Sequence, residues 1–121
     1  MDHNIHTYIA PGRRAHLVGI GGVSMSPLAE VLHGAGMVIT GSDMREGPAV
    51  AHLRSLGIPV AIGHREENVG DAELVIRTAA VHDSNPEIAA ARARGIPVFE
   101  RAQAWGAIMK GYQNALCISG T

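Results

Sequence analysis

Residues 16–35, HLVGIGGVSMSPLAEVLHGA, place an apolar run, a cluster of glycines and a helical pattern in direct succession. After the glycines, apolar residues recur at the i, i+3, i+4, i+7 spacing of one buried helix face. The segment therefore predicts a strand, a tight turn and a helix. The first amides of such a helix lack internal partners and lie at the positive end of its dipole, so they bind phosphate well. We expect a nucleotide diphosphate to lie across Gly22, Val23, Ser24 and Met25.

Strand and helix patterns alternate through the remainder of the 121-residue chain. This alternation indicates a parallel sheet with both faces covered. We predict a single-domain α/β fold, a Rossmann-like parallel sheet of about five strands with helices on both faces. Ligands bind outside the carboxyl ends of such strands, so four segments should converge there: the glycine loop, 42–43, 63–64 and 78–80. The expected strands after the first cover residues 37–40, 58–62, 74–76, 96–99 and 115–118.

Composition narrows the classes of partner. Ten Lys and Arg nearly balance eleven Asp and Glu, and aromatic residues make up only 3% of the chain. No basic run stands out, which argues against a nucleic-acid surface or a polybasic membrane contact. No apolar run is long enough for a membrane span. The single cysteine, Cys117, has no internal disulfide partner, which fits a reducing cytoplasm.

Three features of the expected crevice each carry two readings. The pattern Gly19-x-Gly21-x-x-Ser24 departs from the dinucleotide fingerprint by one serine, and it indicates either a phosphate-binding loop or a tight structural turn. Asp43 ends the second strand, where an acid often meets ribose hydroxyls, although Asp also favours turns and caps. His64 follows the third strand and is either a donor to phosphate, ribose or sugar, or a solvated loop residue.

The fourth strand leads into Arg77 and then into Thr78, Ala79 and Ala80. Arg77 faces a phosphate or pairs with a nearby acid, and the three residues after it are candidates to line the ligand. The stretch 85–87, Asn-Pro-Glu, predicts a helix start and nothing more. The histidines show no metal-ligand spacing, and no nucleophile–base pair or paired carboxylates stand out. On these grounds we expect the chain to bind a nucleotide, and we expect neither a metal site nor a catalytic apparatus of its own.

Five motifs in order resemble one known family. They are GIGGVSMSPLAEVL (19–32), GSD (41–43), GHREENV (63–69), DSNPEI (83–88) and GIPVFERA (95–102). Together they resemble the N-terminal domain of the Mur ligases of bacterial cell-wall synthesis, in the branch that joins L-alanine to UDP-N-acetylmuramate. The resemblance covers about His16 to Thr121.

The resemblance implies an activity for a longer enzyme. ATP activates the lactyl carboxylate of UDP-N-acetylmuramate as an acyl phosphate, with magnesium assisting, and the amine of L-alanine attacks it to give an amide, ADP and phosphate. The N-terminal domain holds the UDP part of the substrate. The matching positions run along the diphosphate loop and the strand ends: Gly21, Gly22, Val23, Ser24, Met25, Ser26, Asp43, His64, Thr78, Ala79 and Ala80. The family commonly has serine at the positions of Thr78 and Ala79, so a hydroxyl is kept at the first and lost at the second.

The resemblance also implies a domain division. We expect a flexible leader at 1–14, the UDP-sugar-binding domain at 15–112 and the first strand of a truncated ATP-binding central domain at 113–121. Ser119, Gly120 and Thr121 match the opening of the family's P-loop, so Gly120 and Thr121 are candidate ATP contacts. By itself this part of the enzyme is expected to bind substrate without catalysis, with no cofactor of its own and in the cytoplasm. Sites for ATP, magnesium and L-alanine belong to absent domains.

Three alternatives stay open. The glycine loop and Asp43 also fit a stand-alone NAD-type sensor module. A related ligase that reattaches recycled murein tripeptide has a similar domain, although the GIGG and DSNPE stretches favour the alanine ligase. The third reading is an α/β domain without a ligand, which the density of small residues in the loop makes the least favoured.

Overall fold

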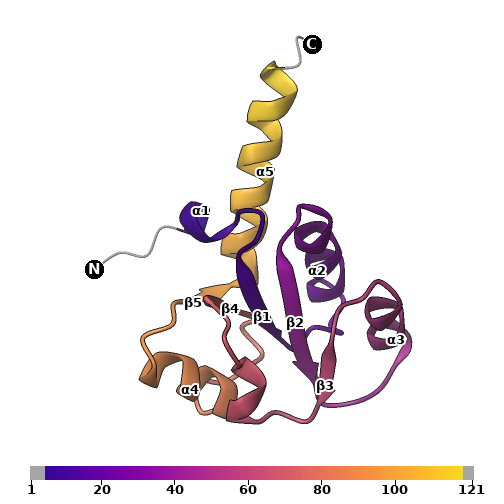
Figure 1. Ribbon diagram of the computed structural model, residues 1–121, viewed down its shortest axis with the longest axis vertical. Helices are drawn as coiled ribbons and strands as arrows, with labels where there is room; N and C mark the ends of the chain where they lie inside the picture. The colour runs from indigo at the N-terminus through magenta and orange to yellow at the C-terminus, as the bar shows by residue number, and fades with distance from the viewer. Residues whose placement is uncertain (1–4, 119–121) are drawn as a thin grey trace.

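The computed structural model describes the backbone of residues 5–118 and the side chains of Ile5 and residues 8–109. Its centre is a five-stranded parallel sheet in the order β3-β2-β1-β4-β5 (Figure 1). The predicted Rossmann-like parallel sheet is therefore confirmed. The chain adds strands on one side of β1 and then on the other, which makes the β1–β4 boundary the switch point of the sheet. The strands are β1 (Arg14–Val18), β2 (Val38–Asp43), β3 (Val60–Ile62), β4 (Leu74–Arg77) and β5 (Val98–Glu100).

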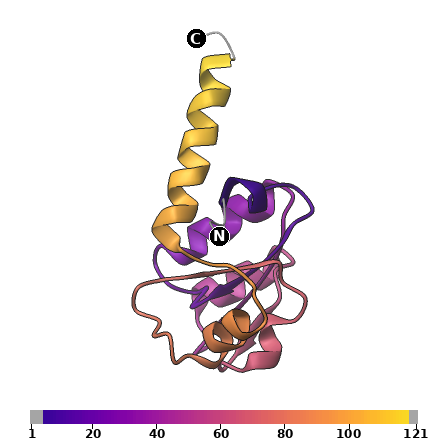
Figure 2. The same cartoon turned by 90° about the vertical axis from the view of Figure 1, so that its left-hand side faces the viewer.

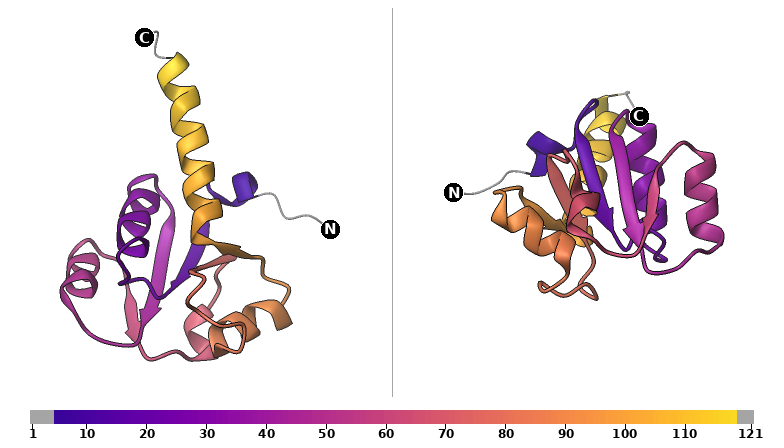
Figure 3. Two further views of the ribbon diagram at one scale, coloured as in Figure 1. Left: turned by 180° about the vertical axis from the view of Figure 1, so that it is seen from behind. Right: turned by 60° about the horizontal axis from the view of Figure 1, so that its bottom comes forward.

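Helices cover both faces of the sheet, as predicted (Figure 3). The larger core cluster joins the sheet to α2, α3 and α5, while a smaller cluster joins the opposite face to α4 and to a 3₁₀ helix, η1. The described helices are α1 (Ile5–Tyr8), α2 (Met25–Gly34), α3 (Pro48–Ser55), η1 (Glu66–Val69), α4 (Pro86–Ala93) and α5 (Arg101–Ile118). In the described part of the chain, none of these helices has the length and hydropathy that crossing a bilayer requires.

Alternation along β1 divides its side chains between the two cores. Ala15 and Leu17 belong to the larger cluster, and Val18 belongs to the smaller one. His16 lies on the same face as Val18, although it is polar and only 1% exposed. A buried polar group on a sheet face needs a partner, and the site described below supplies it.

Gly41 lets the glycine loop pack directly on β2. A Cβ atom at this position would lie 2.7 Å from Cβ of Ile20, closer than real side chains approach. The amides of Gly19 and Ile20 both donate to the carbonyl of Ser42, at 2.9 and 3.0 Å. The loop after β1 is therefore held against the end of the neighbouring strand by packing and by hydrogen bonds.

Two expectations about the ends of the chain differ from the structure. The leader is not wholly loose, because Ile5–Tyr8 form a helix and Ile5, Tyr8 and Ile9 pack against the larger core. The sixth strand predicted at 115–118 is wrong, because α5 continues through Ile118. This segment extends away from the sheet in Figures 1 and 2, where a strand would find no neighbour for its backbone groups. A helix satisfies those groups internally. Gly120 and Thr121 lie outside the described residues.

Candidate functional site

An open crevice with a volume of about 670 Å³ lies at the carboxyl ends of the strands. Segments that follow β1, β2, β3 and β4 all contribute to it, as the switch-point rule predicts. It brings together five of the predicted UDP-sugar contacts: Gly22, Asp43, His64, Thr78 and Ala80. The other predicted positions among the described residues, Gly21, Val23, Ser24, Met25, Ser26 and Ala79, are outside its lining.

The amide groups of the glycine loop divide into two sets. Gly22 donates to the carbonyl of Gly19 at 3.1 Å, and Ser26 donates to the carbonyl of Gly22 at 3.0 Å. Within the described residues, the amides of Val23, Ser24 and Met25 donate no hydrogen bond. They stand at the positive end of α2, where an anion gains from both the dipole and the free donors.

The side chains of Val23, Ser24 and Met25 lie in three different environments. Met25 is fully buried in the larger core, so its side chain does not reach the crevice. Val23 is 96% exposed. The hydroxyl of Ser24 does not cap α2, and its carbonyl accepts from the indole Nε1 of Trp105 at 3.4 Å. The loop therefore offers an approaching ligand chiefly its backbone.

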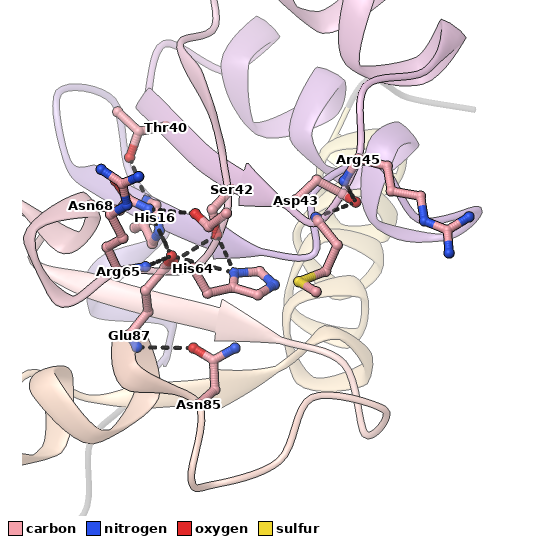
Figure 4. A network of polar contacts seen from close by, with 12 residues as sticks. His16, Thr40, Ser42, Asp43, Arg45, His64, Arg65, Asn68, Asn85 and Glu87 are labelled. Atoms are coloured by element: carbon pink, nitrogen blue, oxygen red, sulfur yellow. Dashed lines mark hydrogen bonds and ion pairs between the residues drawn. The ribbon is translucent and has the colours of Figure 1, made fainter.

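Asp43 ties the end of β2 to the glycine loop. Its Oδ2 accepts from the amide of Gly21 at 2.8 Å, and its Oδ1 accepts from the amide of Met44 at 2.8 Å (Figure 4). A Cβ atom at Gly21 would lie 2.8 Å from the same Oδ2, so glycine is required for this approach. Asp43 therefore acts as a turn residue that accepts from backbone amides, not as a helix cap, and its side chain also borders the crevice.

A buried polar network, which we call the Glu87 network, lies beside the crevice (Figure 4). Glu87 is 0% exposed and is surrounded by donors. Its Oε1 accepts from Nε2 of His16 at 2.5 Å and from Oγ of Ser42 at 2.6 Å. Its Oε2 accepts from the amide of Arg65 at 3.0 Å and from Nδ2 of Asn68 at 2.9 Å. One carboxylate on α4 thereby joins β1, β2 and the segment after β3.

The ionisation of Glu87 follows from these contacts. Burial alone raises the pKa of a carboxyl, but hydrogen bonds from His16, Ser42 and Asn68 outweigh burial and lower the pKa of Glu87 from 4.5 to about 2. Glu87 is therefore a carboxylate at neutral pH and can only accept. It follows that His16 carries a proton on Nε2, while its Nδ1 lies 2.9 Å from Oγ1 of Thr40.

His64 connects the Glu87 network to the crevice. The side chain is 13% exposed, and its Nδ1 lies 3.0 Å from Oγ of Ser42 and 3.3 Å from Oε2 of Glu87. The expectation that His64 is a solvated loop residue is therefore wrong. Ser42, His64 and Glu87 do not form a nucleophilic triad, because one ring nitrogen faces both partners and Ser42 is fully buried with its proton directed to Glu87.

Sequence reasoning missed most of the Glu87 network. The helix start at 85–87 is confirmed, since the Asn85 side chain accepts from the amide of Glu87 at 2.9 Å, but the reading that this stretch does nothing more is wrong. A signal was present in the strands. His16 and Thr40 are register partners, so polar residues face one side of two adjacent buried strands. Such a pair calls for a buried polar partner from the covering layer.

Arg77 pairs with an acid, which decides between its two readings. Its guanidinium donates to Asp83, and Arg92 lies 3.4 Å from the same carboxylate. The hydrogen bond from Arg77 and the charges of Arg92 and Arg77 hold the pKa of Asp83 below its ordinary value. This pairing secures the loop between β4 and α4, whose residues Val81, His82 and Ser84 also line the crevice. Among the described residues, no group of three or more His, Cys, Asp and Glu side chains is arranged to hold a metal ion.

The crevice lies at the switch point of a Rossmann-like sheet, next to the start of α2. The family model described as "Mur ligase family, catalytic domain" matches residues 14–113. The chain belongs to the Mur ligase family. Among the curated Mur ligases it is 47% identical over 109 residues to the UDP-N-acetylmuramate--L-alanine ligase of Acetivibrio thermocellus. That alignment covers 90% of this chain and 23% of the relative, so the chain spans less than a quarter of the relative's length.

Two solved Mur ligase structures resemble the fold. The UDP-N-acetylmuramate-alanine ligase of Thermotoga maritima superposes with a TM-score of 0.78 and 40% identity, covering 80% of this chain and 23% of that one. The UDP-N-acetylmuramate:L-alanyl-gamma-D-glutamyl-meso-diaminopimelate ligase of Neisseria meningitides gives a TM-score of 0.69 and 25% identity, covering 74% and 29%. The higher identity and the larger TM-score both fall to the alanine ligase.

Proposed function

We propose that this Mur ligase chain binds UDP-N-acetylmuramate for an ATP-dependent ligase that joins it to L-alanine. The observation that carries the proposal is a set of three free amides at the start of α2, beside a crevice of the size that a nucleotide needs. The 47% identity to an alanine ligase supports the substrate, and the lower likeness to the tripeptide ligase makes the recycling activity the weaker candidate.

In this proposal the diphosphate lies against the amides of Val23, Ser24 and Met25. Gly22 contributes by having no side chain, since its own amide is engaged by Gly19. The nucleoside and sugar extend along the crevice past Asp43, His64, Thr78 and Ala80, and both oxygens of Asp43 keep lone pairs beyond their bonds to backbone amides. Gly21, Ser26 and Ala79 act through the shape of the loops.

The proposed reaction joins the lactyl carboxylate to the amine of L-alanine through an acyl phosphate, with ATP converted to ADP and phosphate. This chain holds the UDP end, and binding energy from that remote end positions the carboxylate for chemistry elsewhere in the enzyme. ATP, magnesium and L-alanine are assigned to parts beyond the described residues, with Gly120 and Thr121 proposed to open the ATP site. We place the enzyme in the cytoplasm, where UDP sugars and ATP are available.

Calorimetric titration of the 121-residue chain with UDP-N-acetylmuramate, UDP, NADH and ATP tests the proposal. The expected result is binding of the UDP sugar, weaker binding of UDP and no heat with NADH. Binding of NADH alone would overturn the proposal in favour of a dinucleotide sensor. Equal affinity for all four ligands would contradict a site built for a UDP sugar.

A further inference from the structure

His64 lies between the Glu87 network and the crevice. One edge of its ring faces Ser42 and Glu87, and the side chain also lines the crevice. In Figure 4 the opposite edge of the imidazole points away from the network. The two ring nitrogens of His64 therefore have different surroundings. Nδ1 faces the polar groups of the Glu87 network, and Nε2 faces the crevice.

Counting protons around Ser42 decides which ring nitrogen carries the hydrogen. Ser42 has a single hydroxyl proton, and Oγ donates it to Oε1 of Glu87 at 2.6 Å. Its remaining contact, 3.0 Å to Nδ1 of His64, is one in which the hydroxyl oxygen accepts. The second neighbour of Nδ1, Oε2 of Glu87 at 3.3 Å, is a carboxylate oxygen and accepts as well. Nδ1 of His64 must then be the donor to both.

We propose that Glu87 is a positioning residue that fixes His64 in its Nδ1–H tautomer and thereby presents unprotonated Nε2 to the crevice as a hydrogen-bond acceptor. In the neutral ring only one nitrogen carries a proton. The contacts of Nδ1 therefore decide whether Nε2 is protonated. His64 then recognises a hydroxyl or an amide N–H of the ligand and not an oxygen of the diphosphate. The identity of that ligand rests on the proposed function; the tautomer does not.

The position of Glu87 explains why this control is strong. The carboxylate accepts from His16 on β1, from Ser42 on β2, and from Arg65 and Asn68 in the segment after β3. It cannot turn away from His64 without leaving these donors unpaired. A residue without an acceptor at this position would leave either ring nitrogen of His64 able to carry the proton. The orientation of His64 is thus a property of the carboxylate.

Nitrogen-15 NMR of the His64 ring, recorded without ligand at mildly alkaline pH, tests the tautomer directly. In the wild-type chain we expect a protonated Nδ1 and an unprotonated Nε2. Glu87→Gln should shift His64 toward a mixture of tautomers, and Glu87→Asp, which withdraws the carboxylate by one methylene, should do so in part if Glu87→Gln does not fold. His33 on α2 is the control ring and should not change. A protonated Nε2 in the wild type, or an unchanged ring in both folded variants, would overturn the proposal.

Affinity for UDP-N-acetylmuramate tests the acceptor. Asn at position 64 reproduces the donor at Nδ1 but has no atom at Nε2, whereas Gln reaches the Nε2 position with a group that can accept. We expect His64→Asn to weaken binding roughly threefold to tenfold, and His64→Gln, which keeps an acceptor but loses the bond to Glu87, to weaken it less. The reverse order would overturn the acceptor role. Failure of the wild type to bind would count against the proposed function, while the ring spectra would still decide the tautomer.

Discussion

Nε2 of His16 lies 2.5 Å from Oε1 of Glu87, across 71 positions of sequence, and neither side chain is more than 1% exposed. This contact joins the middle of the sheet to the first turn of α4. Burying a carboxylate is costly unless donors satisfy it, and the Glu87 network supplies them. The place of α4 on the sheet is therefore set by polar bonds as well as by the apolar contacts of Ile88 and Ala91.

Acid should destabilise the fold through Glu87. Its pKa is lowered from 4.5 in the unfolded chain to about 2 in the fold, so the unfolded state binds its proton first as the pH falls. The stabilisation is fully present above about pH 4.5 and is lost as the pH falls toward about 2. A difference of this size corresponds to on the order of 3 kcal/mol. Urea unfolding at a series of pH values measures it.

Glu87→Gln is the matched control for the acid prediction. Glu73 and Asp83 also have lowered pKa values and remain in both proteins, so only the difference between the two profiles reports on Glu87. The variant should be less stable at neutral pH and should show a shallower loss toward low pH. Parallel profiles for the two proteins would contradict the assignment.

The fold was predictable because its signals are local. Apolar periodicity, the glycine stops after α3 and α4, and the Asn85 cap each act within a few residues, and together they specify a parallel α/β sheet. The Glu87 network was not predictable in the same way, because His16, Ser42 and Glu87 meet only after the sheet has formed. The prediction of a sixth strand failed for a related reason. A short apolar run such as 115–118 fits a helix and a strand equally well until a neighbouring strand is known.

Gly41→Ala should destabilise the fold. The added Cβ would lie 2.7 Å from Cβ of Ile20 and 2.9 Å from its Cγ2, and the loop that carries Ile20 is tied to Ser42. Overpacking of this kind costs about 1–3 kcal/mol. Chemical unfolding measures the change. Gly106→Ala is the control, since an added Cβ there meets nothing within 4 Å in α5 and should leave stability equal or higher. Equal stability of Gly41→Ala and the wild type would refute the packing argument.

Arg77→Met should loosen the loop between β4 and α4. The change removes the hydrogen bond to Asp83 and also removes Nε, which is buried and makes no hydrogen bond to the described residues. We therefore expect little change in global stability but several-fold faster amide hydrogen exchange at residues 78–84. Arg92→Met is the control, because Arg92 is more exposed and lies 3.4 Å from Asp83. Exchange that is equally fast in both variants would show that Arg77 does not secure the loop.

Gly22→Val should abolish nucleotide binding while leaving the fold largely intact. A Cβ at Gly22 would lie 3.3 Å from the carbonyl of Gly19 and 3.9 Å from Cβ of Met25, which small adjustments accommodate, but the branched side chain would occupy the space in front of the free amides. Calorimetry with UDP-N-acetylmuramate measures the loss, and circular dichroism checks the fold. Gly34→Val is the matched control, because it adds the same side chain to the far end of α2, where nothing lies within 4 Å. Gly34→Val should bind like the wild type. Undiminished binding by a folded Gly22→Val protein would remove the diphosphate from this loop.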